Sequence, residues 1–397
     1  MARIALVLAA LGAVSCGTLL SSTDPNKPKD LVCGKLYLAS GTGEALTDAL
    51  AGAQGGDCVV AAGATYRGSF TVPTDVSLVA SEGATVVLTG DSADQPALRV
   101  MGGPHSTIRG IRVASSTGMG IVVDPGPAFL VGVSVTKAGK AGLMASCTGA
   151  DCLDDAHENT FSGVDVSECA IGLWVAGTRA TLTGGRVAGS KAQSLTSGHG
   201  VIASHGARLV MTGTTVENNE AIGVLVDGTS GTGATLTDVK VLGNLDRGIW
   251  AQGLLGSDAV PKLVITGDST LIDSNRIAGV GARDSSGVSI TGGTISNTLK
   301  ASIPVTLGTL EDVGDGVGLF SGTGAARIEN VTLTGNFRSQ VLVDQGLAGI
   351  HVANAPTAGG KYQIVVQKTL ATVDAPASQL SAPGVELGVS APAIPVQ

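Results

Sequence analysis

Three residues of this 397-residue chain are the first candidates for acid–base chemistry. Asp154 and Asp155 are adjacent, and His199 stands between Gly198 and Gly200. Hydrolysis of a glycosidic bond with inversion needs a carboxylic acid to protonate the leaving oxygen and a carboxylate to activate water. Asp154, Asp155 and His199 are therefore the candidate catalytic residues, although the sequence separates His199 from Asp155 by 44 positions.

The aspartate pair belongs to an acidic stretch, ADCLDDAHEN, that also contains Asp151 and Glu158. Oxygen ligands this close together could bind Ca²⁺, but their spacing matches no EF-hand loop. A solvated acidic loop with Cys147 and Cys152 at its ends is the simpler interpretation. The sequence has no set of Cys and His residues at metal-ligand spacing, so we assign no metal ligand.

A short repeated pattern must set the positions of these residues. In VENNEAIGVLV, VLGNLDRGIWA and IDSNRIAGVGA an asparagine stands four residues before a glycine, and LTGNFRSQVLV has Gln340 in the glycine place. The repeat glycines, together with Gln340, follow one another at intervals of 22 to 37 residues, and each unit contains about three short apolar alternations. Units of this size with strand-like content predict a solenoid with three strands per turn. The repeat glycines are Gly120, Gly142, Gly172, Gly200, Gly223, Gly248, Gly279 and Gly316.

Stacking of the turns would bring equivalent residues to about the 4.8 Å spacing of neighbouring strands. Asn219, Asn244, Asn275 and Asn336 would then form one column, in which side-chain amides bond to the amides above and below. Asparagine also tolerates the left-handed backbone conformation that we expect at this corner. The glycine column would relieve steric conflict where the next strand begins.

This arrangement resembles the right-handed parallel β-helix proteins of the pectin-lyase-like superfamily. Residues 44–72 are similar to the opening of that family, in which an amphipathic helix caps the barrel end. The resemblance implies an all-β right-handed parallel β-helix solenoid of roughly a dozen rungs with an N-terminal helical cap, which we place at residues 31–370. A signal peptide (1–15) and a flexible tether (16–30) would precede it, and an irregular tail (371–397) would follow it. The helical spacing of the cap is set by Ala45, Leu46, Ala49, Leu50 and Ala53.

The family resemblance leaves the activity open, because this fold hosts lyases, hydrolases, esterases, epimerases and non-enzymatic adhesins. Polygalacturonase-like hydrolases combine an Asp-Asp pair and a Gly-His-Gly with an Asn-Thr-Asp and an Arg-Ile-Lys. Here no Asn-Thr-Asp precedes Asp154, and the segment beginning at Arg327 reads Arg-Ile-Glu. Gly200 is also the repeat glycine, so a purely structural role explains the Gly-His-Gly around His199.

A second candidate site is the apolar column two residues after each repeat glycine. Alternation along the strand should turn this column outward, as a stripe of a kind that soluble proteins rarely leave bare. Its tryptophans could bind sugar rings or a partner chain. Alternatively, residues 146–158, residues 189–197 or the C-terminal tail cover the stripe. The predicted binding residues are Met144, Trp174, Ile202, Leu225 and Trp250.

The N-terminus predicts export. Arg3 precedes an apolar run too short to span a bilayer, and the run ends in AVSCG. This resembles a bacterial lipobox, which implies acylation at Cys16 and a membrane anchor in the outer membrane or at the cell surface. An ordinary secretory signal, giving a periplasmic or secreted protein, is the alternative.

Export permits disulfides. We expect the pairs Cys147–Cys152 and Cys33–Cys58, with Cys169 left as a buried thiol, although Cys169 could compete for either loop cysteine. The net charge of −8 gives no basic footprint, so we expect no nucleic-acid partner.

These observations favour a lipid-anchored, non-catalytic protein that presents a binding face to a polysaccharide or a surface protein. A polysaccharide lyase or glycoside hydrolase with an atypical site is the first alternative. A structural spacer or adhesin is the second. Apart from a possible Ca²⁺, the sequence indicates no cofactor.

Overall fold

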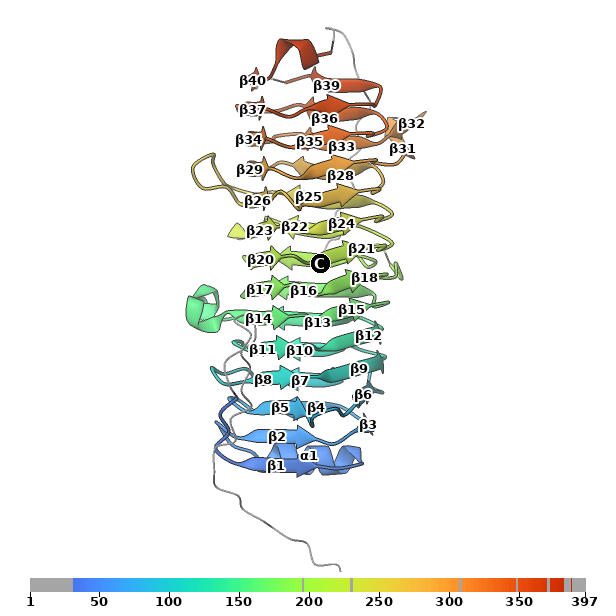
Figure 1. Ribbon diagram of the computed structural model, residues 1–397. Coiled ribbons are helices and arrows are strands. Elements are labelled where there is room, and N and C mark those ends of the chain that lie inside the picture. The colour runs from blue at the N-terminus through green and yellow to red at the C-terminus, as the bar shows by residue number, and fades with distance from the viewer. Residues whose placement is uncertain are drawn as a thin grey trace, which may run out of the picture.

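The chain forms a long parallel β-solenoid (Figure 1). The computed structural model describes residues 31–194, 196–228, 231–306, 309–347, 349–369, 372–381 and 387. Three parallel sheets of 14, 12 and 12 strands run along the molecule and make about 13 turns. The sequence prediction of an all-β right-handed β-helix is therefore confirmed.

Apart from those at the two ends, each turn contributes one strand to each sheet. Sheet 1 contains β1 (Leu36–Ala39), β2 (Cys58–Ala61), β5 (Ser77–Ala80), β8 (Thr107–Arg109), β11 (Phe129–Val131), β14 (Asn159–Ser162), β17 (Arg179–Thr183), β20 (Arg208–Thr212), β23 (Gly233–Thr237), β26 (Leu263–Thr266), β29 (Ser286–Thr291), β34 (Gly324–Glu329), β37 (Ile350–Ala353) and β40 (Val373–Asp374). Sheet 2 contains β3 (Ala64–Arg67), β6 (Val86–Gly90), β9 (Ile111–Ser116), β12 (Ser134–Ala138), β15 (Asp165–Ser167), β18 (Arg186–Ala188), β21 (Thr215–Glu217), β24 (Lys240–Leu242), β27 (Leu271–Asp273), β30 (Thr294–Ser296), β35 (Thr332–Thr334) and β38 (Thr357–Ala358). Sheet 3 contains β4 (Phe70–Val72), β7 (Leu98–Val100), β10 (Ile121–Val123), β13 (Ala141–Ser146), β16 (Ile171–Ala176), β19 (Val201–Ser204), β22 (Val224–Asp227), β25 (Arg247–Gln252), β28 (Ala278–Arg283), β33 (Asp315–Phe320), β36 (Ser339–Asp344) and β39 (Tyr362–Gln367).

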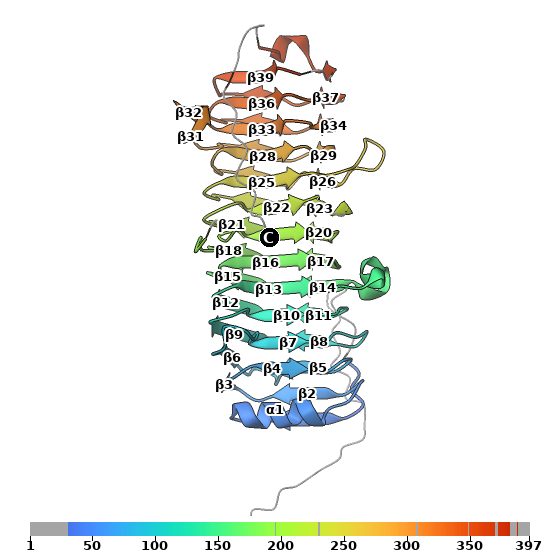
Figure 2. The same ribbon diagram turned by 180° about the vertical axis from the view of Figure 1, so that it is seen from behind.

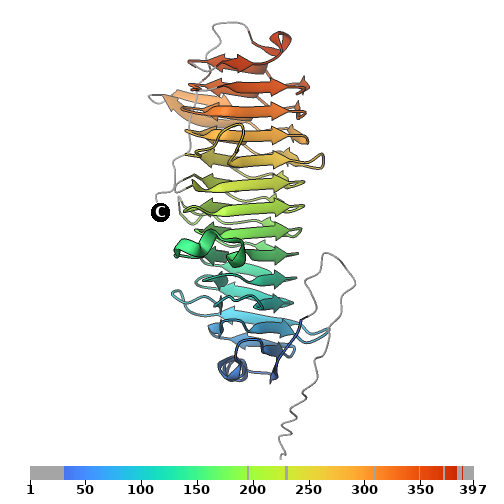
Figure 3. The same cartoon turned by 90° about the vertical axis from the view of Figure 1, so that its left-hand side faces the viewer.

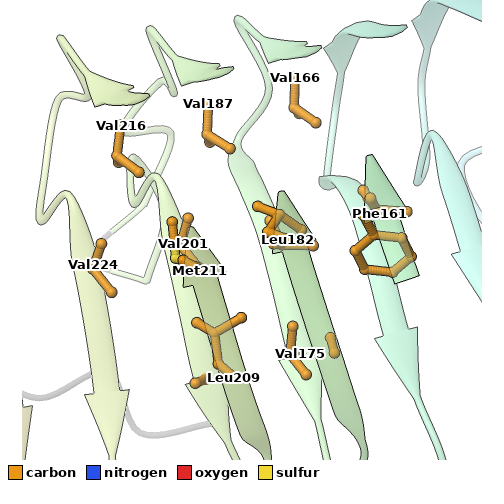
Figure 4. Close-up of a cluster of buried hydrophobic side chains, with 14 of the residues drawn as sticks. Phe161, Val166, Val175, Leu182, Val187, Val201, Leu209, Met211, Val216 and Val224 are labelled. Atoms are coloured by element: carbon orange, nitrogen blue, oxygen red, sulfur yellow. The ribbon is translucent and has the colours of Figure 1, made fainter. Parts of the chain in front are cut away.

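The core consists of aliphatic columns, because in each strand the side chains of alternate residues point inward. Figure 4 shows Val187, Val216, Leu209, Val201 and Val224 converging from the three sheets. Each of these side chains is almost fully buried. A single turn could not enclose such a core, which is why stability depends on stacking.

The predicted asparagine column exists at the corner between sheets 2 and 3. Asn219 Nδ2 donates to Asn244 Oδ1, and Asn244 Nδ2 donates to Asn275 Oδ1, each at 2.8 Å. Thr298 takes the next place, and its hydroxyl donates to Asn336 Oδ1 at 2.7 Å. The column therefore contains all four predicted asparagines, with Thr298 between Asn275 and Asn336.

The left-handed residue at this corner is not the one that the sequence predicted. Positive φ angles occur one position earlier, at Asn218 (54°), Gly243 (60°) and Ser274 (55°). The ladder asparagines are thus selected for their side-chain amides, and the residue before each one turns the chain.

The repeat glycines allow close approach of the next turn. A Cβ on Gly223 would lie 2.6 Å from the Gly248 carbonyl oxygen and 2.7 Å from Asn244 Nδ2. Gln340 can occupy the equivalent place because the following turn has Gly359 and Gly360 at its corner. The Gln340 amide instead donates to the Gly359 carbonyl oxygen at 2.9 Å.

The N-terminal end is closed by α1 (Gly43–Gly52), as predicted. The Thr42 hydroxyl caps the helix by accepting from the Ala45 amide, and Leu46, Ala49 and Leu50 are buried against the first turn. At the other end β40 continues the solenoid beyond the expected boundary at residue 370 and is followed by the 3₁₀ helix η4 (Ala377–Gln379). The predicted signal peptide and tether, residues 1–30, lie outside the described residues.

Some of the longer connections carry secondary structure of their own. Residues between β13 and β14 form the 3₁₀ helices η1 (Ala150–Leu153) and η2 (Asp155–His157), which project from the stack (Figures 1 and 3). An antiparallel hairpin of β31 (Ala301–Thr306) and β32 (Thr309–Val313) precedes β33.

Candidate functional site on sheet 3

The outward apolar column lies on sheet 3, whose strands face the viewer in Figure 2. Strand pairing puts Val122 beside Met144, Met144 beside Trp174, and then continues through Ile202, Leu225 and Trp250. The predicted register is therefore correct. The column extends at its ends to Arg99, Gly281, Gly318, Leu342 and Val365.

The middle part of the stripe is covered, which agrees with the alternative interpretation of the sequence and not with binding at Ile202, Leu225 and Trp250. Ile202, Leu225 and Trp250 are 3%, 4% and 0% exposed, so they are unavailable to a ligand in this structure. They belong to an apolar cluster that also contains Leu387 from the C-terminal tail. The described residues of 146–158 and 189–197, the other two segments considered as covers, contribute nothing to this cluster.

Trp250 is held by a specific set of neighbours. Its ring lies over Gly281, where a Cβ would come within 2.4 Å of ring atoms, and stacks on Phe320 at 5.8 Å between centroids. Its indole N–H donates to Gln252 Oε1 at 3.2 Å, and the Arg247 guanidinium lies 4.7 Å from the ring centroid. Gly281 in the outward column thus makes room for an aromatic ring from the adjacent turn.

Met144 and Trp174 form the part of the stripe that remains partly exposed. Trp174 is oriented by its indole N–H, which donates to Ser204 Oγ at 3.0 Å. One aromatic surface and one flexible thioether therefore lie side by side on β13 and β16.

A cavity of about 230 Å³ adjoins Met144. Arg99 and Asp124 lie 3.8 Å apart at its wall, as a half-exposed ion pair. Lys140 and Asp94 also line it, and within the described chain neither has a salt-bridge partner. The remaining lining residues are Ala93, Gln95, Pro96, Met119, Val122 and Ser146. The cavity therefore combines apolar surface with charges of both signs.

The predicted acidic loop is organised by pairing with sheet 1. Asp155 forms a salt bridge with Arg179, and Glu158 accepts a hydrogen bond from the Thr181 hydroxyl. Within the described residues no three His, Cys, Asp or Glu side chains are grouped so that they could hold a metal ion. The calcium prediction gains no support from this geometry.

His199 occupies a different place from the aspartates. Asp154 and Asp155 follow β13, whereas His199 precedes β19, two turns farther along and at the opposite end of the sheet 3 strands. The three predicted catalytic residues therefore do not share a cleft.

The environment of His199 is apolar. Its side chain is buried, Nε2 has no hydrogen-bond partner in the described structure, and Nδ1 accepts from the Ile222 amide at 3.4 Å. Burial lowers its pKa to about 4, so the ring is neutral near pH 7. This is a buried histidine at the corner slot that Ile222 and Arg247 fill in later turns.

Both predicted disulfides are present, with Cα–Cα distances of 5.4 Å for Cys33–Cys58 and 5.6 Å for Cys147–Cys152. Cys169 is a buried free thiol, as expected. It takes a ladder place, since its sulfur accepts from the Ala138 amide at 3.4 Å. Burial raises the pKa of this thiol to about 11.

Sequence reasoning missed a buried ionic cluster beside the β31–β32 hairpin. Arg338 Nε donates to Asp315 Oδ1 at 2.9 Å, and Arg338 Nη1 donates to Glu311 Oε1 at 3.0 Å. Arg338 and Asp315 are 4% and 2% exposed at the side chain. Asp315 stands one residue before a repeat glycine, which is an unusual place for a carboxylate and the one signal that the sequence offered.

The chain belongs to the family described as "Right handed beta helix region", whose pattern matches residues 153–356. The A-module of mannuronan C-5 epimerase AlgE4 from Azotobacter vinelandii is 13% identical, with a TM-score of 0.56 over 85% of this chain and 100% of that module. The A-module of mannuronan C-5 epimerase AlgE6 from the same organism is 14% identical, with a TM-score of 0.40 over 83% and 95% of the two chains. A comparison with curated proteins found no match. At these identities the structural likeness shows the fold alone.

The two disulfides are typical of proteins in an oxidising compartment, outside the cell or in the periplasm. No helix among the described residues is long and apolar enough to cross a bilayer.

Proposed function

We propose that this protein is an exported, non-catalytic glycan-binding β-helix whose site is the cavity at Arg99, Asp124, Lys140 and Met144, extended by Trp174. The observation that carries this proposal is that a partly exposed aromatic and thioether surface adjoins Lys140 and Asp94, neither of which has a salt-bridge partner in the described chain. Sugar rings present C–H faces that pack on apolar side chains and hydroxyls that bond to charged groups.

The absence of a shared cleft for Asp154, Asp155 and His199 supports binding over hydrolysis. The cavity has two carboxylates, but Asp124 is engaged by Arg99. A lyase or hydrolase using Lys140 as base is the second candidate, because this amine is exposed beside Arg99 and Asp94.

A glycan array and a polysaccharide-degradation assay on the exported form test both functions. We expect binding without product, and a loss of roughly tenfold in affinity, about 1.4 kcal/mol, for Trp174→Ala and for Met144→Ala. Leu310→Ala is the matched control, because Leu310 is 70% exposed on the distant hairpin. Full binding by both sheet 3 variants would contradict the site, and product formation would establish the enzyme instead.

We also propose that Cys16 carries the lipid that anchors the protein to a membrane. The sequence AVSCG supports this proposal, and the disulfides support export. Incorporation of a labelled fatty acid, lost in Cys16→Ser, is the expected result. Label retained in that variant would remove the anchor from consideration.

A further inference from the structure

The covered part of the sheet 3 face is continuous with the C-terminal tail. Its apolar cluster combines residues of sheet 3 and its corner with one residue that is remote in sequence, Leu387. Leu387 is 8% exposed, although no strand contains it. The members of the cluster are Ile202, Ile222, Leu225, Trp250, Phe320, Leu342, Val365 and Leu387.

The Gln367 side chain holds the Leu387 backbone. Leu387 N donates to Gln367 Oε1, and Gln367 Nε2 donates to the Leu387 carbonyl oxygen, each at 2.7 Å. Gln367 is itself oriented by Asp344, whose Oδ1 accepts from the same amide at 2.8 Å. A carboxamide that offers one donor and one acceptor in this way binds an extended chain as a neighbouring strand would.

The sequence after Leu387 fits an apolar groove. Residues 388–397 read GVSAPAIPVQ and contain no charged side chain, so their burial would leave no unpaired charge. Two prolines favour an extended backbone and need no hydrogen-bond partner for their nitrogens.

The length of this segment also fits. Val365 and Ile202 are separated by six strand pairings along sheet 3, which corresponds to about 29 Å. Ten extended residues reach at most about 33 to 36 Å. The segment could therefore extend from Leu387 to the far end of the covered column.

We propose that the outward column of sheet 3 from Ile202 to Val365 is a docking groove for an uncharged, extended apolar peptide, and that its occupant is the chain's own C-terminal segment, residues 388–397. The groove begins where the partly exposed pair Met144 and Trp174 ends.

Tryptophan fluorescence tests the proposal directly, because the chain has two tryptophans. In a Trp174→Phe background Trp250 is the sole emitter, so its emission and its quenching by acrylamide report on the groove. Deletion of residues 388–397 should shift the emission to longer wavelength and raise the quenching constant several-fold. A synthetic peptide of residues 388–397 should restore both values saturably.

A full-length variant guards against failure of the truncated chain to fold. Ile394→Asp and Val396→Asp together should produce the same emission shift, whereas Gln397→Asp, a charge at the extreme end, should produce a smaller one. Unchanged Trp250 emission and quenching in both the deletion and the double variant would overturn the proposal. Dependence of the full-length signal on protein concentration, with dimers in light scattering, would also overturn it by making a second copy the occupant.

Discussion

At the scale of single residues, the corner asparagines of the solenoid act through their amides. Asn244 accepts from both the Asn219 backbone amide and the Asn219 side chain, and it donates to Asn275. All three residues are buried. Each amide therefore satisfies groups that no water can reach.

Asn244→Ala should lower the free energy of unfolding by about 3 kcal/mol, because it leaves buried donors and an acceptor without partners. Urea unfolding followed by circular dichroism measures the loss. Thr183→Ala, at an exposed position on sheet 1, is the control and should change stability by less than about 0.5 kcal/mol. A loss below 1 kcal/mol for Asn244→Ala, on the order of one exposed hydrogen bond, would contradict a cooperative ladder.

His199 should make the protein sensitive to acid. The pKa of His199 is about 4 in the folded chain, and the ordinary value of a histidine is 6.5. Between these two pH values the folded state therefore binds fewer protons than the unfolded state. The contribution of the neutral ring is complete above pH 6.5 and is lost as the pH falls towards 4, by at most about 3 kcal/mol. His199→Ile, which copies Ile222 of the next turn, should flatten stability between these pH values. Unfolding measured between pH 4 and 7 checks this, and an equal loss of stability in His199→Ile and in the unmodified chain would contradict it.

At the scale of one turn, the glycine column shows what the repeat requires. Gly223 has ordinary backbone angles, but a Cβ there would collide with the Gly248 carbonyl and the Asn244 amide. Gly132 has the opposite character, with φ of 57° and no atom within 4 Å of the added Cβ. Close contact with the next turn requires glycine at the place of Gly223, whereas the left-handed backbone conformation favours glycine at the place of Gly132.

Gly223→Ala should destabilise the protein by about 1 to 3 kcal/mol, because the neighbouring turn must shift to relieve overpacking. Gly132→Asn should be nearly neutral, since asparagine adopts the left-handed conformation readily. Thermal unfolding of the two variants gives the comparison. Equal losses in both would mean that close approach is not what selects the repeat glycine.

The strand register could be predicted from sequence because the repeat fixes the position of each residue relative to the repeat glycine. The asparagine column and the outward stripe both follow from these positions. Coverage of the stripe could not, since Leu387 reaches Gln367 from outside the repeat. The pairing of Asp155 with Arg179 was equally hidden, because a loop and a strand of the next turn meet there. Residues fixed by the periodicity were predictable, and contacts made by segments outside it were not.

At the scale of the whole molecule, a solenoid has two ends at which core and strand edges would face water. Helix α1 covers the first end with Leu46, which is fully buried, while Leu38 on neighbouring β1 is 79% exposed. These two leucines, eight residues apart, form a matched pair. The helical cap therefore contributes to the free energy of unfolding in a way that stacking of turns cannot, because it buries the core at the end of the stack.

Leu46→Ala should cost about 2 to 5 kcal/mol, because it removes the side chain that seals the first turn and leaves a cavity against it. Leu38→Ala should have an effect within about 0.5 kcal/mol. Light scattering on heating would reveal a second consequence: opening of the cap exposes β1 as an unpaired edge, so the Leu46 variant should aggregate before it loses its far-ultraviolet signal. Equal stability of the two variants would mean that the stack is held by its turns alone and that α1 is dispensable.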